Sequence, residues 1–192
     1  MLVMPNSTEQ PKLLVFAGPN GSGKSNVSRA IPLIGTYVNA DDLKAEHGLS
    51  DLEAAQQAEM LRNQLLSQRL DFSFETVLST ERNLFLMNRA KDAGYKSHCI
   101  YVLTTHPDIN VSRVISRVAT GGHDVPEEKI RARYFRALAL IPKVNQLCDE
   151  FLLYDNTTTP VLIYSKIGIS NKIFPSDFWS EDRIKDLLNN IL

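Results

Sequence analysis

The chain has 192 residues, of which 43% are hydrophobic, and its formal net charge is −1. These values suit one soluble α/β domain, and the balanced charge gives no reason to expect nucleic acid or membrane binding. No stretch approaches the ~20 apolar residues of a membrane span, and the N-terminus lacks the apolar core of a signal peptide, so we expect a cytoplasmic protein.

The first elements expected along the chain are a strand, a glycine-rich loop and a helix. Within a single domain over residues 1–192, residues 1–10 are expected to form a flexible tail. Residues 12–17 are mainly apolar, which is typical of a buried strand. A helix over residues 24–31 is then expected to stop near Pro32.

Between this strand and helix lies Gly18-Pro19-Asn20-Gly21-Ser22-Gly23-Lys24-Ser25, a phosphate-binding loop of the pattern G-x-x-x-x-G-K-S. The glycines let the backbone N–H groups turn inward, so that the loop and the helix N-terminus form an anion cradle. Lys24 is expected to reach the β- and γ-phosphates of ATP or GTP, and the Ser25 hydroxyl to bind Mg²⁺. The alternative, a glycine-rich turn with a surface lysine, is weaker because eight residues fit in the right context.

The rest of the chain alternates between short apolar runs and longer stretches with helical spacing. Further strands are expected at residues 36–39, 71–76, 97–103, 151–154 and, near a sheet edge, 160–167. Helices are expected at about 50–70, 80–93, 107–120, 124–142 and 176–192. The helix at 50–70 opens on a capping box, Ser50 with Glu53, and is expected to turn Leu52, Leu61 and Leu65 towards the core.

This alternation predicts right-handed βαβ crossovers and a mainly parallel sheet of about five or six strands, flanked by helices. The fold class is therefore α/β, with the P-loop NTPase fold of nucleotide kinases. Ligands in such folds bind at the carboxyl ends of the strands, so the residues directly after each strand are the candidate site residues.

Acids and hydroxyls follow several of the predicted strands. Asp41 and Asp42 follow the second strand, Glu75 and Thr76 end the third, and Thr104 follows the fourth. A carboxylate such as Asp41 can accept a hydroxyl proton during phosphoryl transfer to an alcohol, or can instead coordinate Mg²⁺. Glu75, Thr76 and Thr104 are the candidate contacts for that alcohol. Helix capping and turn chemistry is the alternative explanation and is favoured for Asp42.

Arginines gather on both sides of a predicted hinge. Arg117 lies near the end of one helix, a Gly-Gly pair follows at 121–122, and Arg131 and Arg133 lie on the next helix. Such a segment, about 117–133, can close over bound phosphates as a lid, with guanidinium groups stabilising the transferring phosphoryl group. A solvated helix face is the alternative for each arginine.

Four stretches in the same order resemble the zeta-toxin family of P-loop kinases. They are the loop at 18–25, Val38-Asn39-Ala40-Asp41, Phe72-Ser73-Phe74-Glu75-Thr76, and the segment from Gly121 to Tyr134. More closely, the chain resembles the short bacterial branch often labelled predicted ABC-type ATPases or kinases. The resemblance covers about residues 12–156.

Zeta toxins use ATP or GTP to phosphorylate the sugar 3′-hydroxyl of UDP-N-acetylglucosamine, and an antitoxin protein inhibits them. The resemblance implies that Lys24 and Ser25 bind the triphosphate and Mg²⁺, that Asp41 is the catalytic base, and that Glu75 helps to hold the substrate. It also implies that Arg117 and one of Arg131 and Arg133 clamp the phosphates.

The leading hypothesis is therefore a small-molecule kinase of zeta-toxin type. A second hypothesis is a kinase for another hydroxylated metabolite or an antibiotic. A third is a nucleotide-dependent switch that binds a partner and hydrolyses slowly. A switch needs no base at Asp41, whereas a kinase does.

Overall fold

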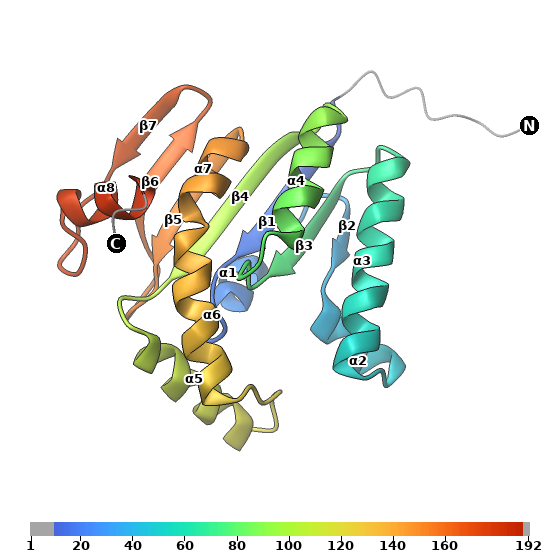
Figure 1. The fold of residues 1–192 in the computed structure, drawn as a ribbon, viewed down its shortest axis with the longest axis horizontal. Coiled ribbons are helices and arrows are strands. Elements are labelled where there is room, and N and C mark those ends of the chain that lie inside the picture. The colour runs from blue at the N-terminus through green and yellow to red at the C-terminus, as the bar shows by residue number, and fades with distance from the viewer. Residues whose placement is uncertain (1–9, 190–192) are drawn as a thin grey trace, which may run out of the picture.

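A seven-stranded sheet forms the centre of the protein, for which the computed structural model describes residues 10–189 (Figure 1). The strand order is β2-β3-β1-β4-β5-β6-β7. In chain order the strands are β1 (Lys12–Ala17), β2 (Thr36–Val38), β3 (Phe72–Thr76), β4 (Lys96–Leu103), β5 (Glu150–Asp155), β6 (Val161–Ile167) and β7 (Ser170–Ile173). Strands β1 to β5 pair in parallel, and β6 and β7 are antiparallel. The predicted α/β fold with a mainly parallel sheet is confirmed.

Helices cover both faces of the sheet. They are α1 (Lys24–Ala30), α2 (Ala40–His47), α3 (Asp51–Ser67), α4 (Arg82–Asp92), α5 (Pro107–Ala119), α6 (Glu127–Ala139), α7 (Ile141–Leu147) and α8 (Glu181–Asn189). Alternate residues of a strand point to opposite faces of the sheet, so the side chains of β1 contribute to two hydrophobic cores. Leu13 and Val15 join the larger core under α3, α4, α7 and α8, while Leu14 and Phe16 pack with Val27 of α1.

Strand β1 occupies the middle of the parallel part of the sheet. It pairs with β3 on one side and with β4 on the other, so that Ala17 lies opposite both Thr76 and Tyr101. Parallel strands end at the same edge of the sheet, and the segments that follow β1, β3 and β4 therefore converge there. This convergence places the phosphate-binding loop beside the end of β3.

Three elements of the fold were not predicted: strand β7, helix α2 and helix α7. A single helix was expected over 124–142, but α6 ends at Ala139 and α7 starts at Ile141, with Pro142 in its first turn, where proline is tolerated. The sheet has one strand more than the five or six predicted, because β7 turns back after Gly168 (φ +59°) and pairs with β6 as a hairpin. The strand is short and mostly polar, so it lacks the apolar alternation that identifies strands. Helix α2 buries none of its side chains and gives no periodic apolar signal.

Helix α3 begins at the predicted capping box and buries Leu65 as expected, with Leu61 packed against the core, but the predicted core residue Leu52 is exposed. The Ser50 hydroxyl accepts from the Glu53 N–H, and the Glu53 carboxylate accepts from the Ser50 N–H. Leu52 is 67% exposed, whereas Arg62 is only 8% exposed. The buried side of the helix is formed by Ala54, Ala58, Arg62, Leu65 and Leu66.

The predicted tail at residues 1–10 falls outside the described residues except for Gln10. Organisation of the chain as a single domain stays a prediction. Within residues 10–189, every helix is too short or too polar to cross a membrane.

Candidate active site

Two asparagine side chains, one on α5 and one directly after β5, hold the phosphate-binding loop in place by hydrogen bonds to its carbonyl groups. Asn110 of α5 donates to the Asn20 carbonyl (2.6 Å), and Asn156, directly after β5, donates to the Ser22 carbonyl (2.7 Å). Both asparagine side chains are buried. The Gly18 N–H also donates to the Thr76 carbonyl (3.2 Å), which ties the loop to the end of β3. The loop is thus preorganised by the protein itself.

Close packing explains why glycine occupies two positions of this loop. Gly23 caps α1 with φ +89°, and a Cβ atom there would lie 2.1 Å from the Asn156 amide nitrogen. Gly21 has φ +75°, and a Cβ atom there would lie 2.4 Å from the Asn110 carbonyl oxygen. Both conformations are unfavourable for residues with a side chain, and the space beneath them is already filled.

Lys24 lies at the electrostatic centre of the site. Burial lowers the pKa of its ammonium group, Glu75 and Asp41 raise it, and Arg117 and Arg133 lower it again. The structure therefore brings together five of the residues that the sequence analysis selected, from five different elements or connections. Two carboxylates and two guanidinium groups around one lysine suit a site that binds Mg²⁺ together with a highly charged phosphate chain.

The Glu75 carboxylate is held by three hydroxyl donors. Ser25 donates to one oxygen (2.9 Å), and Ser28 (2.6 Å) and Tyr37 (2.7 Å) donate to the other. Burial, and then the hydrogen bond to Glu75, raise the pKa of the Tyr37 phenol, so it stays protonated as a donor. Asn39 in turn donates to the Tyr37 oxygen (3.3 Å). Glu75 is therefore fixed in place next to the serine that is expected to bind Mg²⁺.

Two connected cavities open beside the phosphate-binding loop. The larger, of about 1020 Å³, extends from α1 past β2 and α2 to the 121–123 segment, and the smaller, of about 330 Å³, lies over the loop itself. Seven residues line both cavities: Ser25, Asn39, Asp41, Lys44, Glu75, Arg117 and His123. Lys24 and Arg133 line only the smaller cavity. A nucleotide on the loop and a second molecule in the larger cavity would meet at the shared residues.

Asp41 and Asp42 lie in the first turn of α2, with different surroundings. The Asn39 side chain caps this helix by accepting from the Asp41 N–H (2.9 Å), which fixes the backbone at the site. Asp41 lines both cavities, whereas Asp42 lines only the larger one. Burial, and then the neighbouring Glu75 and Asp41 charges, raise the pKa of Asp42. Of the two acids, Asp41 is the one placed between loop and cavity.

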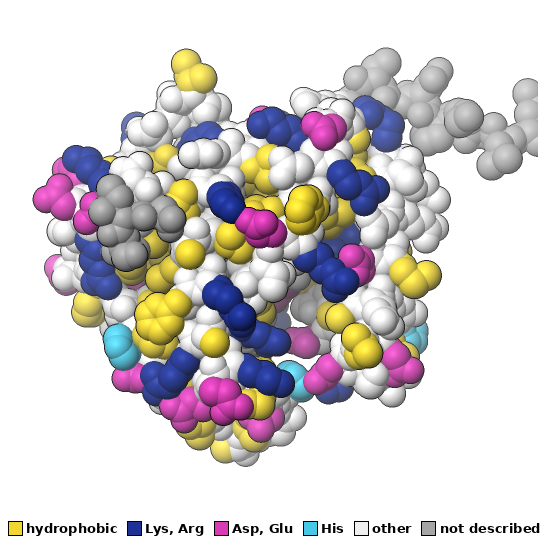
Figure 2. Space-filling model, in the orientation of Figure 1, with side chains coloured by type: hydrophobic (Ala, Val, Ile, Leu, Met, Phe, Trp, Pro, Cys, Tyr) yellow, Lys and Arg dark blue, Asp and Glu magenta, His cyan; other side chains and the backbone are white. Residues whose placement is uncertain are grey.

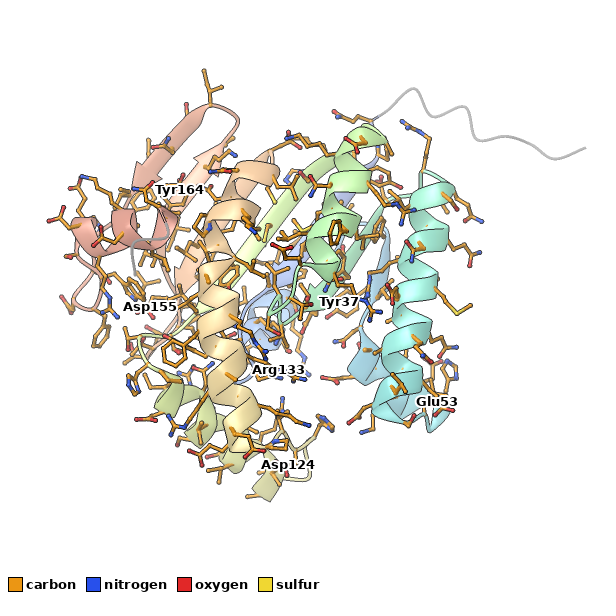
Figure 3. All side chains as sticks on the ribbon, viewed as in Figure 1. Tyr37, Glu53, Asp124, Arg133, Asp155 and Tyr164 are labelled. Atoms are coloured by element: carbon orange, nitrogen blue, oxygen red, sulfur yellow. The ribbon has the colours of Figure 1, made fainter. Side chains whose placement is uncertain are left out.

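The structure separates Arg133 from Arg131. Arg133 projects from α6 towards the loop, where its guanidinium donates to the Asn20 side chain (3.3 Å), and Figure 3 shows it near the middle of the molecule. Arg131 instead pairs with Glu127 (2.8 Å) and with Asp108, and it lines neither cavity. Arg117 lines both. Only Arg117 and Arg133 are thus placed beside Lys24.

Thr76 and Thr104 have structural partners that the sequence did not reveal. Thr76 lines the smaller cavity, but its hydroxyl accepts from the Leu78 N–H (2.9 Å) and from Asn83 (2.6 Å). Thr104 is fully buried, lines neither cavity, and hydrogen-bonds to Asn110, the anchor of the loop. The structure therefore does not bring Thr104 to the position expected for a substrate contact.

The connection between α5 and α6 covers one side of the cavities. Its irregular part is shorter than the predicted 117–133 segment, since α5 continues to Ala119 and α6 starts at Glu127. Arg117 donates to the His123 carbonyl (2.7 Å). The His123 ring reaches across to Lys44 (3.3 Å) and lies 3.8 Å from an oxygen of Asp51. The connection thus touches α2 and the start of α3 on the opposite side of the cleft.

The oxygen ligands near the loop fit Mg²⁺ bound together with a nucleotide. Within residues 10–189, no three His, Cys, Asp or Glu side chains are grouped as they are in a protein-only metal site. Mg²⁺ in phosphoryl-transfer sites commonly uses only one or two protein oxygens, with phosphates and water completing its shell. Ser25, Asp41 and Glu75 offer such oxygens around the shared part of the two cavities.

Four residues that support the site were not identified as such from the sequence. They are Ser28, Tyr37, Asn110 and Asn156. Tyr37 and Ser28 act through Glu75, and the asparagines act through loop carbonyls. Asn156 follows a predicted strand, which is a usable signal. The others are fixed only by contacts between residues distant in the chain.

Together, the central loop, the parallel sheet and the cavity lined by acids and arginines define a P-loop α/β protein whose site is suited to phosphoryl transfer. The family model for the zeta toxin matches residues 3–167, and the chain belongs to this family. Membership supports a kinase-type function, as the resemblance of its motifs implied.

One sequence relative is an uncharacterized protein of Haemophilus influenzae, which is 29% identical over 131 residues that cover 65% of this chain and 94% of the relative. The fold is similar to that in the crystal structure of AvrRxo1-ORF1:AvrRxo1-ORF2 with sulphate ions (TM-score 0.71, 17% identity, 94% of this chain). This chain spans slightly less than two thirds, 64%, of that matched chain. It is also similar to a chain of the PezAT chromosomal toxin-antitoxin system of Streptococcus pneumoniae (TM-score 0.60, 16% identity, 96% and 84% covered).

Proposed function

We propose that this protein transfers the γ-phosphoryl group of ATP or GTP to a hydroxyl group of a small acceptor, and that the acceptor is UDP-N-acetylglucosamine. The observation that carries the proposal is the position of Asp41. Its element starts at the carboxyl edge of the sheet, and Asp41 lines both the cavity over the loop and the larger cavity beside it. A base at the junction of two binding spaces is what a kinase needs and a switch does not.

The phosphate chain would lie on the loop, against Lys24 and Arg133. The N-terminus of α1 and the loop backbone favour anions, and Lys24 and the two arginines add three positive charges. Ser25 and Asp41 or Glu75 would hold Mg²⁺, which when bound neutralises charge on the β- and γ-phosphates. Arg117 and Arg133 would bind the phosphoryl oxygens as negative charge shifts during transfer.

In the transfer step, the acceptor oxygen attacks the γ-phosphorus and its proton passes to the Asp41 carboxylate. The new O–P bond forms as the bond between the γ-phosphorus and the bridging oxygen breaks. The electron pair of the broken bond stays on the bridging oxygen, and ADP or GDP leaves. Glu75 would accept a hydrogen bond from the acceptor, since its carboxylate is fixed by Ser25, Ser28 and Tyr37. A rigid carboxylate orients a hydroxyl at little entropic cost.

The larger cavity supports a sizeable acceptor. Its volume of about 1020 Å³ is at the upper end of the roughly 300–1,000 Å³ typical of small-molecule sites. Its wall combines charged groups with apolar ones, among them Arg29, Asp42 and Leu33. A nucleotide sugar presents phosphates, hydroxyls and a flat base, which these side chains could bind.

The connection around Gly121 and Gly122 is proposed to act as a lid. Its only contacts across the cleft that carry charge, among residues 10–189, run from His123 to Lys44 and Asp51. Both partners are exposed or half-exposed, so these contacts are weak and can open. An antitoxin partner is proposed as well, because the PezAT neighbour belongs to a toxin-antitoxin system.

Mass spectrometry of the products tests the proposal directly. The protein is incubated with Mg²⁺ and ATP, first with UDP-N-acetylglucosamine and then with a metabolite extract. The expected product is UDP-N-acetylglucosamine that has gained one phosphate, absent with the Lys24→Ala variant. If a different metabolite is phosphorylated, the protein is still a kinase but UDP-N-acetylglucosamine is not its acceptor. Nucleotide hydrolysis without any phosphorylated acceptor would instead favour the switch.

A further inference from the structure

Arg62 is a buried cation that forms no ion pair with any of residues 10–189. It lies on the inner side of α3 and is only 8% exposed, with its guanidinium carbon 5.1 Å from the centre of the Phe74 ring. Its Nε atom has no hydrogen-bond partner, and none of the ion pairs within residues 10–189 includes this side chain. Buried guanidinium groups are normally paired, because removing the charge from water is costly.

A small cavity lies directly against Arg62, between α3 and α4. It has a volume of about 220 Å³ and is lined by Glu59, Arg62, Asn63, Arg82, Asn83, Phe85, Leu86 and Arg89. Figure 2 shows basic side chains gathered over the seam between these two helices. None of the eight lining residues lines either cavity of the candidate active site. This is therefore a separate pocket.

The pocket carries an excess of positive charge. Three arginines line it, and Glu59 is the only acid among its lining residues. Glu59 pairs with the exposed Arg82 (3.4 Å), and Arg89 donates to the neutral Asn63 side chain (2.7 Å). Burial lowers the pKa of Arg62, the Glu59 carboxylate raises it, and Arg82 lowers it. The lining residues thus carry three positive charges and one negative charge, and Glu59 is paired only with Arg82.

We propose that this pocket binds a phosphoryl group or a similar oxyanion. Arg62 would form the floor, with its position fixed by Phe74 and by the packing of α3. Arg82 and Arg89 line the pocket from α4 and are exposed, so their contacts with Glu59 and Asn63 are weak and can be exchanged for an anion. Asn63 and Asn83 add neutral amide groups to the lining. Guanidinium groups bind phosphate oxygens through paired, charge-assisted hydrogen bonds, so three of them around one small cavity favour a dianion.

An anion bound in this pocket would contact residues that pack against β3, the strand that carries Glu75 of the candidate active site. Arg62 rests on Phe74, which directly precedes Glu75 in β3. Asn83 donates to the Thr76 hydroxyl (2.6 Å) at the end of the same strand. The pocket thus adjoins the strand that carries Glu75.

The test uses inorganic phosphate as the probe, with the phosphate-binding loop already saturated by Mg²⁺ and a non-hydrolysable ATP analogue. Phosphate is titrated against chloride at constant ionic strength, and the Arg62 Nε–H signal is followed by nuclear magnetic resonance. The signal is identified by its loss in Arg62→Lys. We expect a saturable shift of the Arg62 signal with phosphate and none with chloride.

Exposed arginines supply the variants, so the test does not depend on a substitution in the core. The double variant Arg82→Gln, Arg89→Gln removes two surface side chains and should raise the phosphate dissociation constant at least about tenfold. Arg136→Gln, an exposed arginine on α6 outside the pocket, is the matched control and should leave it unchanged. An Arg62 signal that does not shift, or a dissociation constant that the double variant leaves unaltered, would overturn the proposal whatever the loop binds.

Discussion

The proposed base, Asp41, gives the sharpest test of the reaction. Replacing it by Asn keeps the size of the side chain but removes its ability to take the acceptor proton. General-base assistance typically contributes 10² to 10⁴ in rate, or about 2.7–5.4 kcal/mol of activation free energy. We therefore expect Asp41→Asn to lower kcat by at least ~10², with ATP affinity close to that of the wild type.

The same substitution should hardly disturb the fold. Asp41 lies in the first turn of α2, where loss of the negative charge removes a helix-dipole interaction of about 0.3–1 kcal/mol. A 192-residue chain loses roughly 2–4 °C of melting temperature per kcal/mol, so the shift should be no more than about 4 °C. Circular dichroism and thermal melting, recorded beside the kinetics, separate a chemical defect from unfolding.

Asp42→Asn is the matched control, since it makes the same change one residue away and outside the smaller cavity. It should retain kcat within about threefold, the effect of less than ~1 kcal/mol, and any larger effect should fall on the KM of the acceptor, because Asp42 lines the cavity proposed to bind it. If Asp41 instead coordinates Mg²⁺, excess Mg²⁺ should partly restore the Asn variant, whereas a missing base cannot be restored in this way. An Asp41→Asn enzyme as active as the wild type would refute both roles.

Three further predictions follow from contacts around the loop. Arg133→Ala should lower kcat by ~10³ or more if it clamps the transferring group, whereas Arg131→Ala, which breaks only exposed ion pairs, should change steady-state kinetics severalfold at most. Asn156→Ala leaves the Ser22 carbonyl without its buried donor, so unfolding by urea should show a loss of about 1–3 kcal/mol together with weaker nucleotide binding. Hydrogen exchange at residues 120–126 should slow when an ATP analogue binds, and unchanged exchange there would count against a lid.

The sheet and its loop were predictable because their signals are local. A run of buried residues in β1, the eight-residue loop and the start of α1 lie within 19 consecutive positions, residues 12–30, and each element fits the next. The position of Asp41 also followed from a general property of parallel sheets, whose carboxyl ends meet. These inferences required no knowledge of which strand pairs with which.

Residues that work through a distant partner were not predictable in this way. Thr104 was expected at the acceptor because it follows a strand, yet its hydroxyl turns to Asn110 beneath the loop. Leu52 was expected in the core, and Arg62 was not singled out from the sequence, yet in the fold Leu52 is exposed and Arg62 is buried. Choosing between them requires the rotation of α3 against the sheet, which is set by packing with β3 and α4 and not by the helix alone.

The choice between Arg131 and Arg133 shows where local and distant information divide. Two residues apart on a helix lie about 200° apart around its axis, so at most one of the pair can face the loop. The sequence implies this restriction but does not show which arginine faces the loop. Acids lie in the first turn of α6 itself and on the neighbouring helix α5, and either arginine could pair with them. In the fold, Glu127 lies one turn before Arg131 and Asp108 lies opposite, so both neutralise that guanidinium. Arg133 is left to face Asn20 and the loop, which is why its loss, and not that of Arg131, should slow phosphoryl transfer.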